Sequence, residues 1–246
     1  MNVEDFSKGF DTLLNSYALM AGFGSTDHPG TIELDEYEKS QFLTWAQEDV
    51  VLSLYNGKNP YGESLEETEE LRRYLDSLVD EKSYTIGESE AEEATVTGLS
   101  SYSLFFPKPN NLWFIIYESL TVKKGDCGYM TIEVVPIRHD EYHRLKKNPF
   151  RGSNSRRALR LDCGSDKLEV IPDKKYEEGT YYLRYLKTLS PIILVDLDEG
   201  NDIYGVSKKT ECQLHESLHQ KILERAVLMA LQSRGYNVNN NNNENR

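Results

Sequence analysis

The spacing of apolar residues predicts a helix at the start of the chain. Apolar side chains recur there at steps of three and four residues, which is typical of one face of a helix: Val3, Phe6, Phe10, Leu13 and Tyr17. Such a helix gains most of its stability from packing, so we expect this face to be covered by another part of the fold.

Two more helices are predicted before residue 80. Asp35 can cap the first of them, with Glu38 three residues later and Gly57 at its end. A capping box of Ser64 and Glu67 predicts the start of the next one. Their apolar faces are Leu43, Ala46, Val50 and Leu54 in the first and Leu71, Leu75 and Leu78 in the second. The Gly- and Pro-rich segment 21–31, which precedes both, is interpreted as a loop.

The middle of the chain has the composition of an antiparallel sheet. The acidic run 88–93 is interpreted as a linker or hairpin tip, and residues 138–148 as a short helix ended by Pro149. Around them lie stretches rich in β-branched and aromatic residues, which predict strands: 95–106, 112–122, 129–137, 158–163, 167–172 and 180–197.

A closing helix is predicted at 213–234. Leu214, Leu218 and Ile222 share one side of it, and we expect them to seat this helix on the sheet. The Asn-rich tail 236–246 lacks core-forming residues and is predicted to be disordered.

These elements predict an α+β fold with N-terminal helices, a mostly antiparallel sheet and a C-terminal packing helix. The expected organisation is a helical region at 1–80, a mixed α+β region at 81–235 and the tail at 236–246.

Composition narrows the classes of function. The 246 residues include 41 acidic and 28 basic ones, a net charge of −13, which disfavours broad binding to nucleic acid. The start of the chain lacks the features of a signal peptide, and no run of eighteen apolar residues exists. The three cysteines, Cys127, Cys163 and Cys212, form no disulfide pattern. We therefore expect a protein made in the cytoplasm, without a membrane segment.

One catalytic motif occurs in the closing helix. His215, Glu216 and His219 have the His-Glu-x-x-His spacing in which two imidazoles bind zinc and the carboxylate acts on a bound water. A catalytic zinc needs a third protein ligand, and downstream only Glu224 and Glu244 remain. Cys212, His215 and His219 could also belong to a structural zinc site, which would need a fourth ligand. The sequence does not mark one among the candidates, which are Cys127, Cys163, His139 and His143. The two histidines are therefore interpreted as part of a packing helix. No catalytic, cofactor-binding or metal-binding residue is assigned.

Two other clusters favour contact surfaces. The basic residues Arg151, Arg156, Arg157 and Arg160 are expected to contact an acidic neighbouring subunit rather than nucleic acid. The group Tyr181, Tyr182 and Tyr185 is interpreted as strand core and interface, not as a ligand cage.

Several segments together resemble the virion ring proteins at the head-tail junction of crAss-like phages, which infect gut Bacteroides-type bacteria. The segments are "DFSKGFDTLLNSY", "LDEYEKSQFLTWAQEDVVLSLYNG", "SLEETEELRRYLDSLV", "PIRHDEYHRLKKNPFRGSNSRRALRLD", "YYLRYLKTLSPIILVDL" and "ECQLHESLHQKILERAVLMAL". They span nearly the whole chain.

The resemblance implies a non-enzymatic structural protein without a cofactor. Its copies would form a ring, a dodecamer that matches the portal, in contact with the portal protein and neighbouring ring and tail proteins. Packaged DNA would pass through the lumen without specific binding. Two alternatives remain open, a zinc metallohydrolase that uses His215, Glu216 and His219, and a cytosolic interaction protein of α+β fold.

Overall fold

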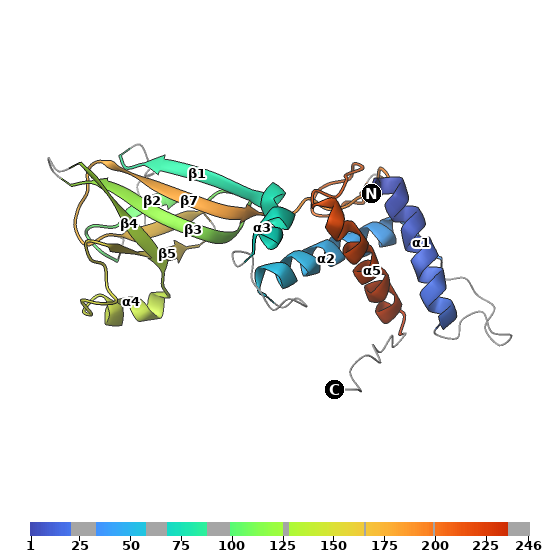
Figure 1. Cartoon of the computed structure of the whole chain (residues 1–246). Coiled ribbons are helices and arrows are strands. Elements are labelled where there is room, and N and C mark those ends of the chain that lie inside the picture. Colours follow the sequence, from blue (N-terminus) through green and yellow to red (C-terminus); the bar gives the residue numbers. More distant parts are fainter. Residues whose placement is uncertain are drawn as a thin grey trace, which may run out of the picture. The chain divides into compact units, whose positions relative to one another are not determined.

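The chain forms two compact units. The computed structural model describes residues 1–20, 33–57, 68–87, 99–124, 128–164, 166–198 and 200–235 (Figure 1). Unit 1 combines Met1–Leu78 with Leu189–Arg246, and unit 2 is Val79–Thr188. The predicted loop 21–31, the capping box of Ser64 and Glu67, the acidic run 88–93, the tail 236–246 and Cys127 lie outside the described residues.

Unit 1 is helical. Its elements are α1 (Val3–Met20), α2 (Glu36–Tyr55), α3 (Glu69–Leu75), η1 (Asp76–Leu78) and α5 (Glu216–Ser233). Asp35 caps α2 as predicted: its Oδ1 accepts from the Glu38 N–H at 2.7 Å, while Glu38 Oε2 accepts from the Asp35 N–H at 3.3 Å. The buried face of α1 continues through Leu14 instead of Leu13, because steps of 3.6 residues move the face along the helix.

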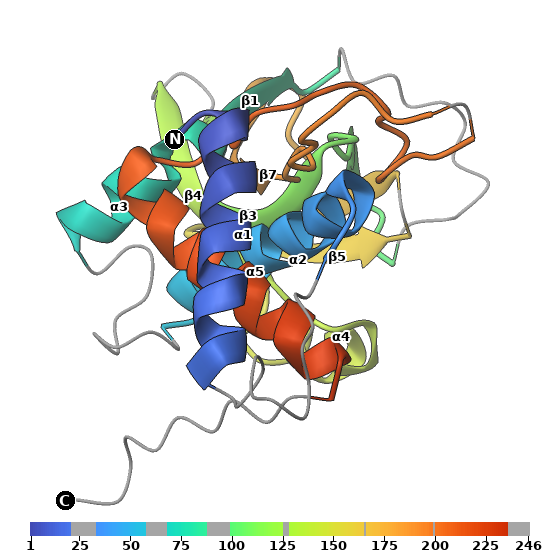
Figure 2. The same cartoon turned by 90° about the vertical axis from the view of Figure 1, so that its right-hand side faces the viewer.

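The closing helix packs within unit 1. α5 lies against α1 and α2 (Figure 2), so the expectation that it seats on the sheet is wrong. Its buried residues Leu218, Ile222 and Ala226 do form one apolar face, as the spacing predicts. At Gly9 of α1 a Cβ atom would lie 2.8 Å from a methyl group of Leu223, so glycine permits the close approach of the two helices. The apolar spacing predicts a face but not the element that covers it.

The predicted strand 180–197 divides between the units. Strand β7 (Gly179–Lys187) ends before Pro191, and the following Ile192, Ile193 and Leu194 are buried in unit 1. There, Thr44 Oγ1 on α2 accepts from the Ile192 N–H at 3.1 Å, and Ser40 Oγ accepts from the Leu194 N–H at 3.0 Å. Helix side chains thus provide the partners that a neighbouring strand would otherwise supply.

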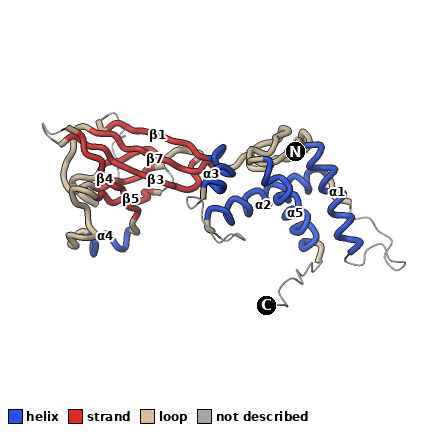
Figure 3. Tube along the Cα trace, viewed as in Figure 1, coloured by secondary structure: helices blue, strands red, loops and turns tan. Residues whose placement is uncertain are grey.

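Unit 2 contains a seven-stranded sheet in its described residues, with the order β1-β7-β3-β4-β5-β6-β2 (Figure 3). The β4–β5 pair is parallel and is joined through α4 (His139–Leu145); the other pairs are antiparallel. This confirms the predicted α+β class. The strands besides β7 are β1 (Val79–Thr85), β2 (Leu104–Pro107), β3 (Leu112–Lys123), β4 (Tyr129–Pro136), β5 (Arg157–Cys163) and β6 (Lys167–Ile171).

Strand β1 was not predicted, because its sequence "VDEKSYT" is polar and follows a helical pattern. It forms an edge of the sheet, where Val79 pairs with Leu186 and Thr85 with Thr180. The core of unit 2 includes the fully buried Tyr181 and Tyr185 on β7, which confirms them as strand core.

None of the helices in the described residues has the length and apolar character needed to cross a membrane.

Candidate interaction surfaces

His215 and His219 have different structural roles in α5. His215 is the N-cap residue: its Nδ1 accepts from the Ser217 N–H at 3.3 Å, and its ring lies against Tyr74. His219 is buried one turn later, with Nε2 3.0 Å from the Leu214 carbonyl oxygen and Nδ1 2.8 Å from the Met1 amine. The Leu214 carbonyl can only accept, so Nε2 carries the proton and Nδ1 is the acceptor. Both His219 nitrogens are therefore already bonded.

The other considered zinc ligands have local partners. The Cys212 thiol donates to Gln47 Oε1 at 3.2 Å, and burial raises the pKa of Cys212 to about 11. The Cys163 thiol donates to Glu169 at 3.6 Å, and His139 Nε2 lies 2.9 Å from the Asp162 carbonyl oxygen. A zinc-binding cysteine must be a thiolate, which a raised pKa disfavours. Among the described residues, no group of three His, Cys, Asp or Glu side chains is arranged to hold a metal ion.

The predicted basic cluster separates into a surface part and a buried part. Arg160 is buried on β5, where its Nε donates to Glu118 at 2.9 Å and its Nη1 to Asp162 at 2.8 Å. Its inclusion in an exposed cluster is therefore wrong, because residues 158–161 of β5 are all buried and both faces of the strand are covered here. Arg151 and Arg156 are exposed, and Arg157 is half-buried.

The surface part lies between the end of α4 and the first residue of β5, and we name residues 146–157 the Phe150 loop. It contains five Lys or Arg residues and no Asp or Glu. Phe150 at its tip is 85% exposed. Sequence reading identified the basic residues but not the exposed ring, since nothing in the local pattern tells an exposed Phe from a buried one.

An aromatic surface of opposite charge lies in unit 1. Trp45 on α2 is 45% exposed and Tyr204 is 59% exposed. Burial and the nearby Glu48 carboxylate raise the pKa of Tyr204, and Trp45 opposes this rise, so side chains of α2 lie close to the Tyr204 hydroxyl. Together with the exposed Asp202 these residues form what we name the Tyr204 patch. The signal in the sequence was an acidic stretch, 194–206, with four Asp or Glu residues and no Lys or Arg, that contains Tyr204 and Gly205.

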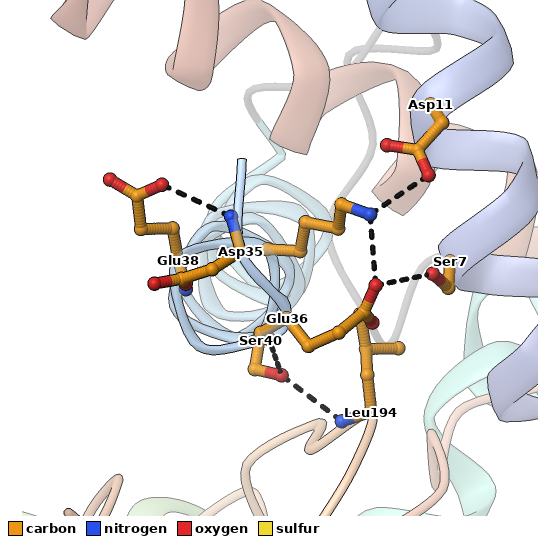
Figure 4. A network of polar contacts seen from close by, with 8 residues as sticks. Ser7, Asp11, Asp35, Glu36, Glu38, Ser40 and Leu194 are labelled. Atoms are coloured by element: carbon orange, nitrogen blue, oxygen red, sulfur yellow. Dashed lines mark hydrogen bonds and ion pairs between the residues drawn. The ribbon is translucent and has the colours of Figure 1, made fainter. Parts of the chain in front are cut away.

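A polar network joins helices α1 and α2 of unit 1. Figure 4 shows Ser7 of α1 bonded to Glu36 of α2, and Ser40 of α2 bonded to the backbone of Leu194. The buried Lys39 ammonium joins the two helices through Asp11 at 2.8 Å and Glu36 at 2.9 Å. Burial lowers the pKa of Lys39, but the bonds to these carboxylates outweigh burial and raise it overall.

Comparison with known proteins finds relatives over almost the whole chain. The model of a family described as phage tail ring protein 3/4 matches residues 1–242. Ring protein 3 of Bacteroides phage crAss001 is 45% identical over 238 residues, which is 95% of this chain and 96% of the relative. Ring protein 4/5 of the same phage is 30% identical over 239 residues, 94% of this chain and 92% of the relative. The similarity therefore covers both units.

Proposed function

The chain belongs to the phage tail ring protein 3/4 family, and from this premise we propose that its copies form a closed ring at the head-tail junction of the virion. The observation that carries the proposal is the 45% identity to Ring protein 3 of Bacteroides phage crAss001 over 95% of the chain. A match of this length includes helices, sheet and connecting loops, so it supports the same structural role for the whole chain.

We further propose that the ring is a dodecamer that contacts the portal protein and neighbouring ring and tail proteins. A ring of twelve would match a twelvefold portal copy for copy. The net charge of −13 supports the passage of packaged DNA through the lumen, because an acidic wall does not adhere to phosphates.

The proposed role is non-enzymatic. It is supported by what the motif residues do: His215 caps α5, and both nitrogens of His219 are engaged by backbone groups. A zinc hydrolase would need both imidazoles to be free for the metal. Zinc analysis of the purified protein tests this part, and stoichiometric zinc lost together with hydrolytic activity in His219→Ala would contradict it.

Imaging tests the ring itself. Purified protein is examined by light scattering and electron microscopy, alone and mixed with the portal protein of the same phage. We expect closed rings, stacked on the portal in the mixture. A chain that stays monomeric in both conditions would contradict the proposal and favour a cytosolic interaction protein.

A further inference from the structure

We propose that neighbouring copies are joined head to tail, with the Phe150 loop of one copy bound to the Tyr204 patch of the next. This inference rests on the proposed ring and adds the surfaces that build it. A closed ring of more than two copies needs two different surfaces on each subunit that are complementary to one another. The chain carries such a pair, one surface in each unit.

The Phe150 loop has the features of a protein contact. An exposed aromatic ring is a common anchor of interfaces, and here basic side chains surround it. Within the described residues, Lys147, Arg151 and Arg156 form no salt bridge, so their charge is available to a partner. The five positive charges of the loop also stand out in a chain whose other residues carry a net charge of −18.

The loop is held in one conformation by its own hydrogen bonds. Asn148 Oδ1 accepts from the Phe150 N–H at 2.9 Å and from the Arg151 N–H at 3.2 Å, and Arg157 donates to the Phe150 carbonyl oxygen at 3.3 Å. At Gly152 a Cβ atom would lie 2.7 Å from the Leu145 carbonyl oxygen, so the tight turn requires glycine. A preorganised loop loses little conformational entropy on binding, which suits a recognition element.

The Tyr204 patch also has a defined conformation, and it includes local backbone strain. Ile203 and Val206 form a β-bridge around a two-residue turn, with φ of +55° at Tyr204 and +78° at Gly205. Asn is usual at the first of these positions, and a Tyr there is strained by about 1 kcal/mol. The strained residue is an exposed aromatic one, and strained residues concentrate at functional sites.

The two surfaces are complementary in charge and in aromatic character. The stretch 194–206 that presents Tyr204 carries four acidic residues, against five basic ones in the Phe150 loop. Asp196 is paired with Lys208 in the same copy, so the other three acidic residues supply the negative charge for a partner. Phe150 can pack edge-to-face on Trp45 and Tyr204, and arginine can stack on the same rings as a cation. A second copy of the chain therefore supplies the partner that each surface lacks.

Two variants with one defective surface each test the pairing. The loop variant combines Phe150→Ala with Arg151→Ser and Arg156→Ser, and the patch variant combines Trp45→Ser with Tyr204→Asn. Every replaced side chain is exposed, and Tyr204→Asn places the preferred residue in the turn, so both variants should fold. Tyr129→Ala, which removes another exposed aromatic ring, is the matched control.

Mass photometry, with and without the portal protein, follows assembly. Each variant alone should associate at least about 30-fold more weakly than wild type and form no ring, as expected for the loss of an interface anchor. Their equimolar mixture should stop at heterodimers, since one intact loop meets one intact patch. Wild type and Tyr129→Ala should form rings.

Rings from either variant alone, or no heterodimer in the mixture while wild type assembles, would overturn the pairing and leave the proposed function intact. Normal rings of the loop variant with weaker retention of DNA would assign the loop to nucleic acid and also overturn the pairing. Wild type that forms no ring in either condition would remove the proposed function itself.

Discussion

The two units bury a basic side chain in different ways. In unit 2 both members of the ion pair are out of water, with the Arg160 and Glu118 side chains 9% and 4% exposed. In unit 1 the Lys39 side chain is 5% exposed, but its partners Asp11 and Glu36 are 47% and 33% exposed. The stability of the Arg160–Glu118 pair thus depends on its geometry, because little water reaches either partner. Water can hydrogen-bond to Asp11 and Glu36 and so compensate for part of the loss of Lys39.

The units also differ in how the chain builds them. Unit 2 is one continuous stretch, while unit 1 unites both ends of the chain, with α5 packed on α1 and α2. The helical unit therefore depends on a long-range contact, and the sheet unit on contacts within its own residues. The comparison predicts that each unit can be destabilised separately.

The largest effect is expected from Ile222→Asp. Ile222 is fully buried on α5, so the change puts an unpaired carboxylate into the core and should cost unit 1 about 5 kcal/mol or more. Hydrogen exchange measured by mass spectrometry should show faster exchange in α1, α2 and α5, with β3 and β7 still protected. Gln220→Asp on the exposed side of α5 is the control. Equal loss of protection in the sheet would mean that the units unfold together.

A smaller effect, confined to unit 2, is expected from Arg160→Met. The change leaves Glu118 buried without its cation and should cost about 3 to 5 kcal/mol in urea unfolding. Burial already raises the pKa of Glu118 against the opposing effects of Arg160 and Tyr181.

The same variant should show a pH dependence of known sign. Without Arg160 the folded state favours protonated Glu118 more strongly, so the destabilisation should be small below about pH 4.3, the unfolded pKa, and grow as pH rises. The exposed Arg138→Met serves as control. A loss that is the same at pH 4 and pH 7 would argue against an isolated buried carboxylate.

Lys39→Met should cost less, about 1 kcal/mol. Its removal leaves Asp11 and Glu36, which water can reach, and the methionine keeps much of the buried packing. The unfolding midpoint of unit 1 reports this effect. A cost equal to that of Arg160→Met would erase the contrast between the two ion pairs.

The smallest effect concerns His219. Burial lowers its pKa, aided by the Met1 ammonium and His215 and opposed by the Leu214 carbonyl and Glu216. The unfolded state, with a pKa of about 6.5, then binds protons more readily than the folded state, so unit 1 should lose stability as pH falls below about 6.5. Urea midpoints at pH 5.5 and 7.5 measure this, and His219→Gln should flatten the difference. His143→Gln, an exposed residue in unit 2, should leave the difference unchanged.

The features that were predicted correctly from the sequence are those that depend on neighbouring residues in the chain. Asp35 and Glu38 are a local cap, and the strands around α4 have local β-propensity, so both could be predicted. The resemblance to crAss-like phage ring proteins is confirmed by the family match. The apolar face of α5 was also correct, because its period is a property of the helix alone.

The predictions that failed concern contacts between residues that are distant in the sequence. The helices that pack on α5, α1 and α2, lie more than 160 residues before Ile222, and no pattern in a single sequence predicts this packing. Strand β1 forms because β7 pairs with it, although Asp80–Ser83 in its middle do not favour a strand. Phe150 is exposed although phenylalanine is usually buried, and Tyr204 has a left-handed backbone that is rare for tyrosine. Only the structure shows these two features.

The pairing of Val79 with Leu186 has a consequence for how such proteins evolve. These residues lie near the start and the end of unit 2, and paired antiparallel residues are about 4.5 to 5.5 Å apart at their Cα atoms. A segment whose ends are neighbours can be exchanged as a cassette, because two genetic crossovers at these points preserve the spacing that the flanking helices require. Such an exchange between related phages would give a different unit 2, with a different Phe150 loop, in a chain that keeps the same unit 1.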